Sequence, residues 1–259
     1  MLAPERQKKI LEILFRQRII KISEIAEEFG VSNLTARRDL DTLQEQDLVR
    51  RVYGGAILTA TPEISMAAFT SPIEHSSKTE KEAIGKLAAS MIEEGDTIHL
   101  GTGTTVLEIA KNIRHMSNLT IVVSSLSIIN ELANSKNTIY VLGGVLDPYE
   151  QKITGHTTLE MLEKYCPDKA FFSCDGVSLK HGVTAYHSYG AESGKIIVKN
   201  STKSFLVANS KKFGLNALNK VCLLSALHGV ITDDLLSSDY REEMEKAGVK
   251  MYYAKTGSE

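Results

Sequence analysis

The sequence has few cysteines and no long apolar run, and both shortages exclude broad classes of protein. Its 259 residues include three cysteines, which lie far apart without a Cys-x-x-Cys pair: Cys166, Cys174 and Cys222. We therefore expect free thiols in a reducing cytoplasm rather than a disulfide framework or a zinc cluster. No apolar run approaches the roughly 18 residues that a membrane-spanning helix needs. The charged start, Met1 to Arg6, does not fit a signal peptide, so the expected location is cytoplasmic, with no membrane partner.

The chain also lacks a large net charge, so its totals do not indicate a nucleic-acid binder. The net charge is −2, with 42% hydrophobic and 24% charged residues, as in a soluble globular protein. A length of 259 residues suits two domains, one small and one of ordinary size. Nucleic-acid binding depends on local patches, however, and the pairs Arg37-Arg38 and Arg50-Arg51 lie within the first sixty residues. Their place in the fold decides whether they bind or are merely solvated.

The histidines do not have the spacing of metal ligands. There are seven of them: His75, His99, His115, His156, His181, His187 and His228. We expect no metal and no cofactor. His187 lies in the loop 185–189, which could fold over a ligand, although an inert surface loop is the simpler interpretation.

The first part of the chain has the pattern of a helix-turn-helix. Residues 5–16 carry apolar side chains at helical spacing. Ser23 is the expected N-cap of a helix over residues 24–29, and Gly30 is expected to end it in the left-handed conformation. A third helix is expected to follow its N-cap Ser32. Two short helices separated by a tight glycine turn form a helix-turn-helix.

The third helix, residues 32–44, has an apolar side and a polar side. Helical spacing places Ala36, Leu40 and Leu43 toward the core, and Asp41 lies on the opposite side. Residues 47–56 combine an apolar strand, a basic and aromatic tip and a glycine turn, which is typical of a β-wing. We therefore predict that residues 1–58 form a winged helix-turn-helix. Its expected DNA contacts are Ser32, Asn33, Leu34, Thr35, Arg37, Arg38, Arg50, Arg51 and Tyr53.

The rest of the chain has the pattern of an α/β domain. Residues 59–78 lose periodicity and hold two of the five prolines, so they are expected to be a linker. Ser77 and Glu80 are expected to form a capping box that opens a helix. Residues 79–259 then alternate short β-rich runs with amphipathic stretches, which indicates a mostly parallel sheet. The expected strands are 97–100, 119–123, 138–142, 170–173, 204–208 and 229–232, and the expected helices include 106–113, 128–132, 159–165 and 193–199.

In a parallel sheet, ligands bind beyond the carboxyl ends of the strands. The segment 101–105, Gly-Thr-Gly-Thr-Thr, follows the first expected strand and leads into a helix, where glycines and free amides favour a phosphate. It is neither a Walker loop nor a dinucleotide fingerprint, and an ordinary strand-to-helix turn is the alternative. Other strand ends contribute Ser124, Ser125, Gly143, Gly144, Asp175 and Lys212. Such a set of groups suits a phosphorylated polyhydroxyl compound.

The DNA-binding segment resembles the signature of the DeoR family of bacterial repressors, through Val31-Ser32-x-x-Thr35-x-Arg37-Arg38-Asp39-Leu40 and the later Gly54-Gly55-Ala56. With the features of the second domain, the resemblance covers nearly the whole chain. It implies a sensor domain that shares its fold with ribose-5-phosphate isomerase. It also implies an effector site that includes Gly101, Thr102, Gly103, Thr104, Thr105, Lys212, Glu192 and Lys195.

The sequence departs from the family pattern at several positions. Tyr53 stands where the family usually has histidine, and it can still contact phosphate. Gly101 and Asn209 stand where the family commonly has aspartates, and Val123-Ser124-Ser125 replaces a Thr-Asn-Ser. Two lost carboxylates remove acceptors for hydroxyls or a partner for lysine, so the identity of the effector stays open.

Three functions follow from these patterns. The first is a repressor of a sugar or polyol catabolic operon, which binds double-stranded operator DNA as a dimer or tetramer and is relieved by a phosphorylated sugar. In the second, the sensor domain is degenerate and serves only oligomerisation. The third is a sugar-phosphate isomerase. Such isomerases use a run of closely spaced acids in catalysis, and residues 175–179 keep only the first of them, Asp175, so this function is disfavoured. We expect no catalytic residues.

Overall fold

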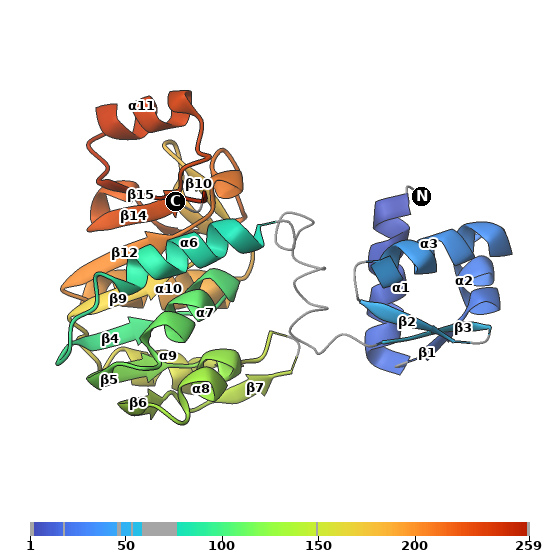
Figure 1. Cartoon of the computed structure of the whole chain (residues 1–259), viewed down its shortest axis with the longest axis horizontal. Coiled ribbons are helices and arrows are strands. Elements are labelled where there is room, and N and C mark those ends of the chain that lie inside the picture. The colour runs from blue at the N-terminus through green and yellow to red at the C-terminus, as the bar shows by residue number, and fades with distance from the viewer. Residues whose placement is uncertain are drawn as a thin grey trace. The chain divides into compact units, whose positions relative to one another are not determined.

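The computed structural model describes residues 3–17, 19–45, 48–52, 54–58, 77–148 and 150–257. They belong to two compact units, Met1–Ser76 and Ser77–Glu259 (Figure 1). Most of the expected linker lies outside the described residues, and the second unit begins at Ser77. Within the described ranges, no helix is long and apolar enough to cross a membrane.

The first unit combines helices with a small antiparallel sheet, as expected for a winged helix-turn-helix. The strand order is β1-β3-β2. Helical spacing brings Ala36, Leu40 and Leu43 into one buried cluster with Ile10 and Leu14, as predicted. The elements are α1 (Ala3–Gln17), β1 (Ile19–Lys21), α2 (Ile22–Phe29), α3 (Asn33–Glu45), β2 (Val49–Val52) and β3 (Gly55–Leu58).

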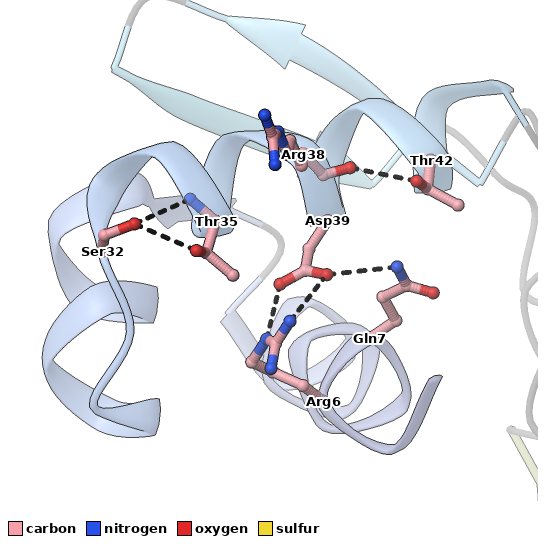
Figure 2. Close-up of polar contacts among 7 residues, drawn as sticks. All are labelled: Arg6, Gln7, Ser32, Thr35, Arg38, Asp39 and Thr42. Carbon is pink, nitrogen blue, oxygen red and sulfur yellow. Dashed lines mark hydrogen bonds and ion pairs between the residues drawn. The ribbon is translucent and has the colours of Figure 1, made fainter. Parts of the chain in front are cut away.

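Local chemistry determines the turn between α2 and α3. Gly30 has a φ of 61°, and its N–H donates to the carbonyl of Ala26, so this glycine ends α2 in the expected left-handed conformation. Ser32 accepts a hydrogen bond from the Thr35 N–H at 3.1 Å (Figure 2). The predicted N-cap of the third helix is therefore confirmed.

The start of α2 differs from the prediction at Ser23. The helix begins at Ile22, directly after β1, and the Glu24 carboxylate accepts a hydrogen bond from the Lys21 N–H at 3.0 Å. Ser23 lies inside the first turn, so the prediction that it caps the helix was wrong. Burial of Ile22, which is 7% exposed, favours the earlier start, because this side chain joins the core of the unit.

The second unit is built on a seven-stranded sheet whose strands are all parallel. The order is β15-β14-β12-β9-β4-β5-β6. The chain starts in the middle at β4, proceeds to one edge, and returns through β9 to the other edge. The strands are β4 (Thr97–Leu100), β5 (Ser117–Val123), β6 (Lys136–Val141), β9 (Lys169–Phe172), β12 (Lys203–Val207), β14 (Gly229–Asp233) and β15 (Met251–Ala254).

Helices cover both faces of this sheet and bury a separate core on each side (Figure 1). One core receives side chains from α6 (Lys78–Ala89), α7 (Thr104–Ile113) and α8 (Leu126–Leu132). The other receives side chains from α9 (His156–Leu162), α10 (Ser188–Asn200) and α11 (Ser238–Lys246). Successive strand residues alternate between the two cores, as Phe171 and Phe172 do.

Smaller elements lie outside the large sheet. A hairpin is formed by β7 (Val145–Asp147) and β8 (Lys152–Thr154). A three-stranded sheet is formed by β10 (Gly176–Ser178), β11 (Gly182–Ala185) and β13 (Asn219–Cys222). Two short 3-10 turns, Ser210–Lys212 and Leu224–Ala226, complete the unit.

The predicted fold class is confirmed, since an α/β unit with a parallel sheet follows a winged helix-turn-helix. All six predicted strands of the large sheet are present, and the seventh, β15, was missed. The prediction of a capping box at Ser77 was wrong. Ser77 precedes α6, but its side chain makes no capping bond to the helix and instead accepts a hydrogen bond from Lys211 at 2.9 Å.

Candidate functional site

The exposed side of α3 holds most of the residues predicted to contact DNA. Ser32, Asn33, Arg37 and Arg38 are exposed. Leu34 is 59% exposed on the same side of the helix start. Thr35 is half-buried against the Ser32 hydroxyl. The structure therefore brings these six residues together over the first turns of one helix.

A buried ion pair holds α3 against α1, and sequence reasoning missed it. The Arg6 guanidinium donates to the two carboxylate oxygens of Asp39, with its Nε 2.6 Å and its terminal nitrogen 3.2 Å away. Gln7 donates to the same carboxylate at 3.2 Å (Figure 2). The side chains of Arg6 and Asp39 are only 8% and 4% exposed. The one signal in the sequence was an acid at a core position of an amphipathic helix, next to the exposed Arg38.

The two wing arginines have different surroundings. Arg50 is exposed, whereas Arg51 is half-buried and bonded to α3. The Arg51 N–H donates to Gln44 Oε1 at 2.8 Å, and its guanidinium donates to the carbonyl of Arg37 at 3.3 Å. It also forms an ion pair with Asp41. Tyr53, the third predicted wing residue, lies outside the described residues.

The segment 101–105 lies at the point where the strand order reverses. It joins β4 to α7, and the N–H of Gly101 donates to the carbonyl of Phe171 in β9 at 2.9 Å. Gly103 has a φ of 111°, and a Cβ there would lie 3.4 Å from Ser173 Cβ, just beyond β9. Thr104 is exposed at the first position of α7, where helix N–H groups lack partners within the helix. Such a place suits an anion.

Two further predicted residues come from the ends of neighbouring strands. Lys212 donates to the carbonyl of Cys174, next to β9, at 2.5 Å. Asp175 accepts a hydrogen bond from the Tyr186 N–H at 2.8 Å, so one of its oxygens holds a loop. The structure thus places Lys212, from the turn after β12, beside the end of β9. Burial raises the pKa of the Cys174 thiol to about 12, so this thiol stays protonated.

Asn209, directly after β12 at this edge, is a buried residue whose side-chain polar atoms lack partners among the described residues. It is 1% exposed, and neither its amide nitrogen nor its amide oxygen has a hydrogen-bond partner. The following residue, Ser210, donates its N–H to Asp233 at 2.7 Å. Buried amides are normally satisfied, so a group that meets both amide atoms would be stabilised here.

Four other predicted residues have contacts that do not require a ligand. Glu192 and Lys195 pair with each other at 2.7 Å on α10, with side chains 54% and 49% exposed. Gly144 has a φ of 150°, and a Cβ there would lie 2.2 Å from Thr158 Oγ1. The carbonyl of Gly143 accepts a hydrogen bond from the same threonine at 2.8 Å. Packing against α9 therefore accounts for both glycines.

Ser124 and Ser125, beyond β5, are buried and adjoin a lysine that sequence reasoning missed. The N–H of Ile153 donates to the Ser124 carbonyl at 2.8 Å, which fastens β8 to this edge. Lys152, the preceding residue, is 9% exposed and forms an ion pair with Glu150. The sequence did not indicate that Lys152 lies here, because only the pairing of its strand with Ser125 brings it to this edge of the sheet.

The six histidines that lie in the described part of the chain are not clustered with other possible metal ligands. Within the described ranges, no group of three or more histidine, cysteine, aspartate or glutamate side chains could hold a metal ion. His99 lies in β4 at 2% exposure, and burial lowers its pKa to about 4, so it is neutral at physiological pH. The His187 side chain is 69% exposed, and its Nε2 lies 3.4 Å from Glu150 Oε1.

Comparison with protein families gives two matches that together span most of the chain. The DeoR-like helix-turn-helix domain matches residues 6–61, and the DeoR C-terminal sensor domain matches residues 76–234. A transcriptional regulator of Haemophilus influenzae is 32% identical over 97% of this chain and 98% of its own length. The lactose phosphotransferase system repressor of Staphylococcus epidermidis is 32% identical over 89% of this chain and 92% of its own length.

Among solved structures, ribose 5-phosphate isomerase A of Methanocaldococcus jannaschii is similar at a TM-score of 0.39 and 16% identity. The match covers 53% of this chain and 55% of that one. The translation initiation factor eIF-2B of Pyrococcus horikoshii reaches a TM-score of 0.43 at 14% identity, over 88% of this chain and 86% of that one.

Proposed function

Since the chain belongs to the DeoR family of transcriptional regulators, we propose that it represses a sugar or polyol catabolic operon and is released from its operator by a phosphorylated sugar. Residues 1–58 bind double-stranded DNA, and residues 79–259 bind the effector and assemble the chain into a dimer or tetramer. It works in the cytoplasm and has no catalytic activity. Similarity to repressors of sugar operons, such as the lactose phosphotransferase system repressor, supports this proposal.

The observation that carries the DNA-binding part is the exposed face of α3. Arg37 and Arg38 are exposed there, while the next residue, Asp39, is buried in the ion pair with Arg6. The buried ion pair therefore fixes α3 to α1, and the exposed face of α3 carries the two arginines. In this proposal α3 enters the major groove, where arginine reads guanine edges or contacts phosphates, and Leu34 meets a thymine methyl.

This part is tested with 30-base-pair duplexes that the wild-type protein recovers from a random-sequence pool. Arg37→Ala and Arg38→Ala should each weaken binding by about tenfold or more, since a lost base contact costs about 1–3 kcal/mol. The matched control is Arg114→Ala, which removes an exposed arginine of the second unit with a side chain 65% exposed. Undiminished affinity in both α3 variants would exclude α3 as the recognition helix.

The effector part rests on the edge where β4, β9 and β12 end. The amides of residues 102–105 at the start of α7 and the ammonium of Lys212 suit a phosphate, and the unpartnered amide of Asn209 suits a hydroxyl. In this proposal a phosphate draws the Lys212 ammonium away from the Cys174 carbonyl. Glu192 and Lys195 are retained as a peripheral pair in this proposal, and so are Ser124, Ser125, Gly143, Gly144 and Asp175 around the ligand.

Thermal unfolding against a panel of phosphorylated sugars and polyols tests the effector part. A ligand at about 100 times its dissociation constant stabilises the domain that binds it by about 2.7 kcal/mol, which raises Tm by a few degrees. Unphosphorylated forms should have no effect. Lys212→Ala should abolish the shift, whereas Lys246→Ala, which removes a lysine 76% exposed on α11, should retain it. If no compound in the panel raises Tm, the second unit more simply serves only to assemble the chain into oligomers.

A further inference from the structure

Arg51 belongs to the wing strand β2, where it pairs with Ala56 of β3, but its side chain is bonded to α3. Its N–H donates to Gln44, and its guanidinium contacts the carbonyl of Arg37 and the carboxylate of Asp41. Its Nε is buried and lacks a hydrogen-bond partner, so that edge of the guanidinium is turned into the protein. A side chain that reaches for a DNA phosphate would have its nitrogens in solvent.

The three partners on α3 have the spacing of one helix face. Arg37, Asp41 and Gln44 stand at i, i+4 and i+7, so Arg51 contacts nearly two turns of α3, with its guanidinium on the Arg37 carbonyl and Asp41 and its backbone N–H on Gln44. Along β2, successive side chains point to opposite sides. Arg50 therefore points away from the side on which Arg51 grips the helix, and it is exposed.

We propose that Arg51 is a positioning residue, which holds the wing at a set angle to the recognition helix α3, and that Arg50 supplies the phosphate contact of the wing. The inference rests on the proposed DNA binding. Asp41 is the partner that turns Arg51 away from DNA, and it cancels the charge that Arg51 would otherwise present. A protein that grips one duplex with a helix and a wing needs both at a fixed separation, and this arginine provides that separation.

Salt dependence of DNA binding separates the two roles. A lysine or arginine that neutralises one phosphate contributes about 0.9 to the slope of log affinity against log salt concentration. The probe is the set of 30-base-pair duplexes selected by the wild-type protein, measured between 50 and 200 mM salt. Arg50→Gln should lower the slope by about 0.9 and weaken binding. The neutral pair variant, Asp41→Asn with Arg51→Gln, should weaken binding by about tenfold without changing the slope.

Single variants and a rescue complete the DNA test. Asp41→Asn alone releases Arg51 toward the duplex and should raise the slope rather than lower it. Arg51→Lys keeps the ion pair with Asp41 and should restore most of the affinity that Arg51→Gln loses. A fall of about 0.9 in the slope of the neutral pair variant, or affinity equal to that of the wild type, would overturn the inference.

Hydrogen exchange of the full-length protein without DNA gives an independent test. Loss of the guanidinium contacts with α3 should raise hydrogen exchange at the amides of β2 and β3 in Arg51→Gln but not in Arg50→Gln. The amides of α1 should stay protected in both variants. Equal exchange in the two variants would overturn the inference even where DNA binding is intact. If the wild-type protein selects no duplex, the proposed function fails, and the positioning role fails with it, whatever the exchange result.

Discussion

Breaking the buried ion pair between Arg6 and Asp39 should unfold the first unit far more readily while leaving the second unit unchanged. The two side chains are 8% and 4% exposed and share two hydrogen bonds, so removal of one partner leaves an almost fully buried charge. Such a loss costs about 3–5 kcal/mol. For Arg6→Met we therefore expect a large fall in the free energy of unfolding of this unit, since Gln7 alone cannot satisfy the Asp39 carboxylate.

The assay is native-state hydrogen exchange of the full chain, read on peptides from α1 and α3. A loss of 3–5 kcal/mol corresponds to roughly 10²- to 5 × 10³-fold faster exchange at amides that open with the whole unit, since about 1.4 kcal/mol is a factor of ten. Peptides from the second unit serve as an internal control. A matched surface variant, Lys246→Met, removes one partner of a pair 76% and 66% exposed, and there the loss should stay below about 1 kcal/mol.

A double variant separates the charge from the packing. Arg6→Met with Asp39→Leu removes both charges and should recover most or all of the lost protection, because apolar pairs of similar volume replace buried ion pairs at little cost. Protection in Arg6→Met within threefold of wild type would refute the reasoning. So would a double variant less stable than either single variant, because the pair would then act through shape rather than charge.

Three further predictions concern the stability and reactivity of the two units. His99 is neutral in the fold because its pKa is lowered from 6.5 to about 4, so only the unfolded chain gains a proton between these two values. The free energy of unfolding should therefore fall as pH falls through this window, by at most about 3 kcal/mol. When it is measured by urea unfolding at several pH values, His99→Leu should depend on pH less steeply than the wild type. Cys174, with its pKa raised to about 12, should resist a thiol reagent in the native state whereas the exposed Cys166 reacts quickly, and loss of the fast phase in Cys174→Ser would contradict this. Gly30→Ala should cost about 1–2 kcal/mol from its φ of 61° alone, and Gly55→Ala should cost more, since its Cβ would lie 2.1 Å from the Ile20 carbonyl; the reverse order in thermal unfolding would be inconsistent with this geometry.

Periodicity and turn chemistry predicted the elements that depend on near neighbours in the chain. The helix from Ser32, its core residues and the left-handed Gly30 follow from rules that act within a few residues. Most strands of the central sheet were also predicted from the sequence, because burial on both faces of a parallel sheet favours runs rich in apolar residues. The edge strand β15 was missed although its residues 251–254 are apolar, and three of these four residues are only half-buried.

Local rules failed where a distant partner outweighed them. Ser77 had the position of a helix cap, but its hydroxyl bonds to Lys211, more than a hundred residues away in the chain. Ser23 had the right residue type for a cap, but the strand before it and the burial of Ile22 moved the helix start. At Ser77 a tertiary hydrogen bond replaced the local one, whereas at α2 the burial of Ile22 moved the start of the helix.

By itself, the sequence determined the two-unit plan, the parallel sheet and the helix that carries Arg37 and Arg38, because each depends on the spacing of residue types along the chain. Only the tertiary structure decided which charged groups are exposed and which are paired. Arg50 and Arg51 are neighbours of one type, yet one is exposed and the other is bonded to α3. Asp39 and Asp41 lie two residues apart, yet one is buried against α1 and the other meets the wing. The reason is that pairing of charges depends on which elements pack together, and that arrangement is not encoded in the spacing of either partner.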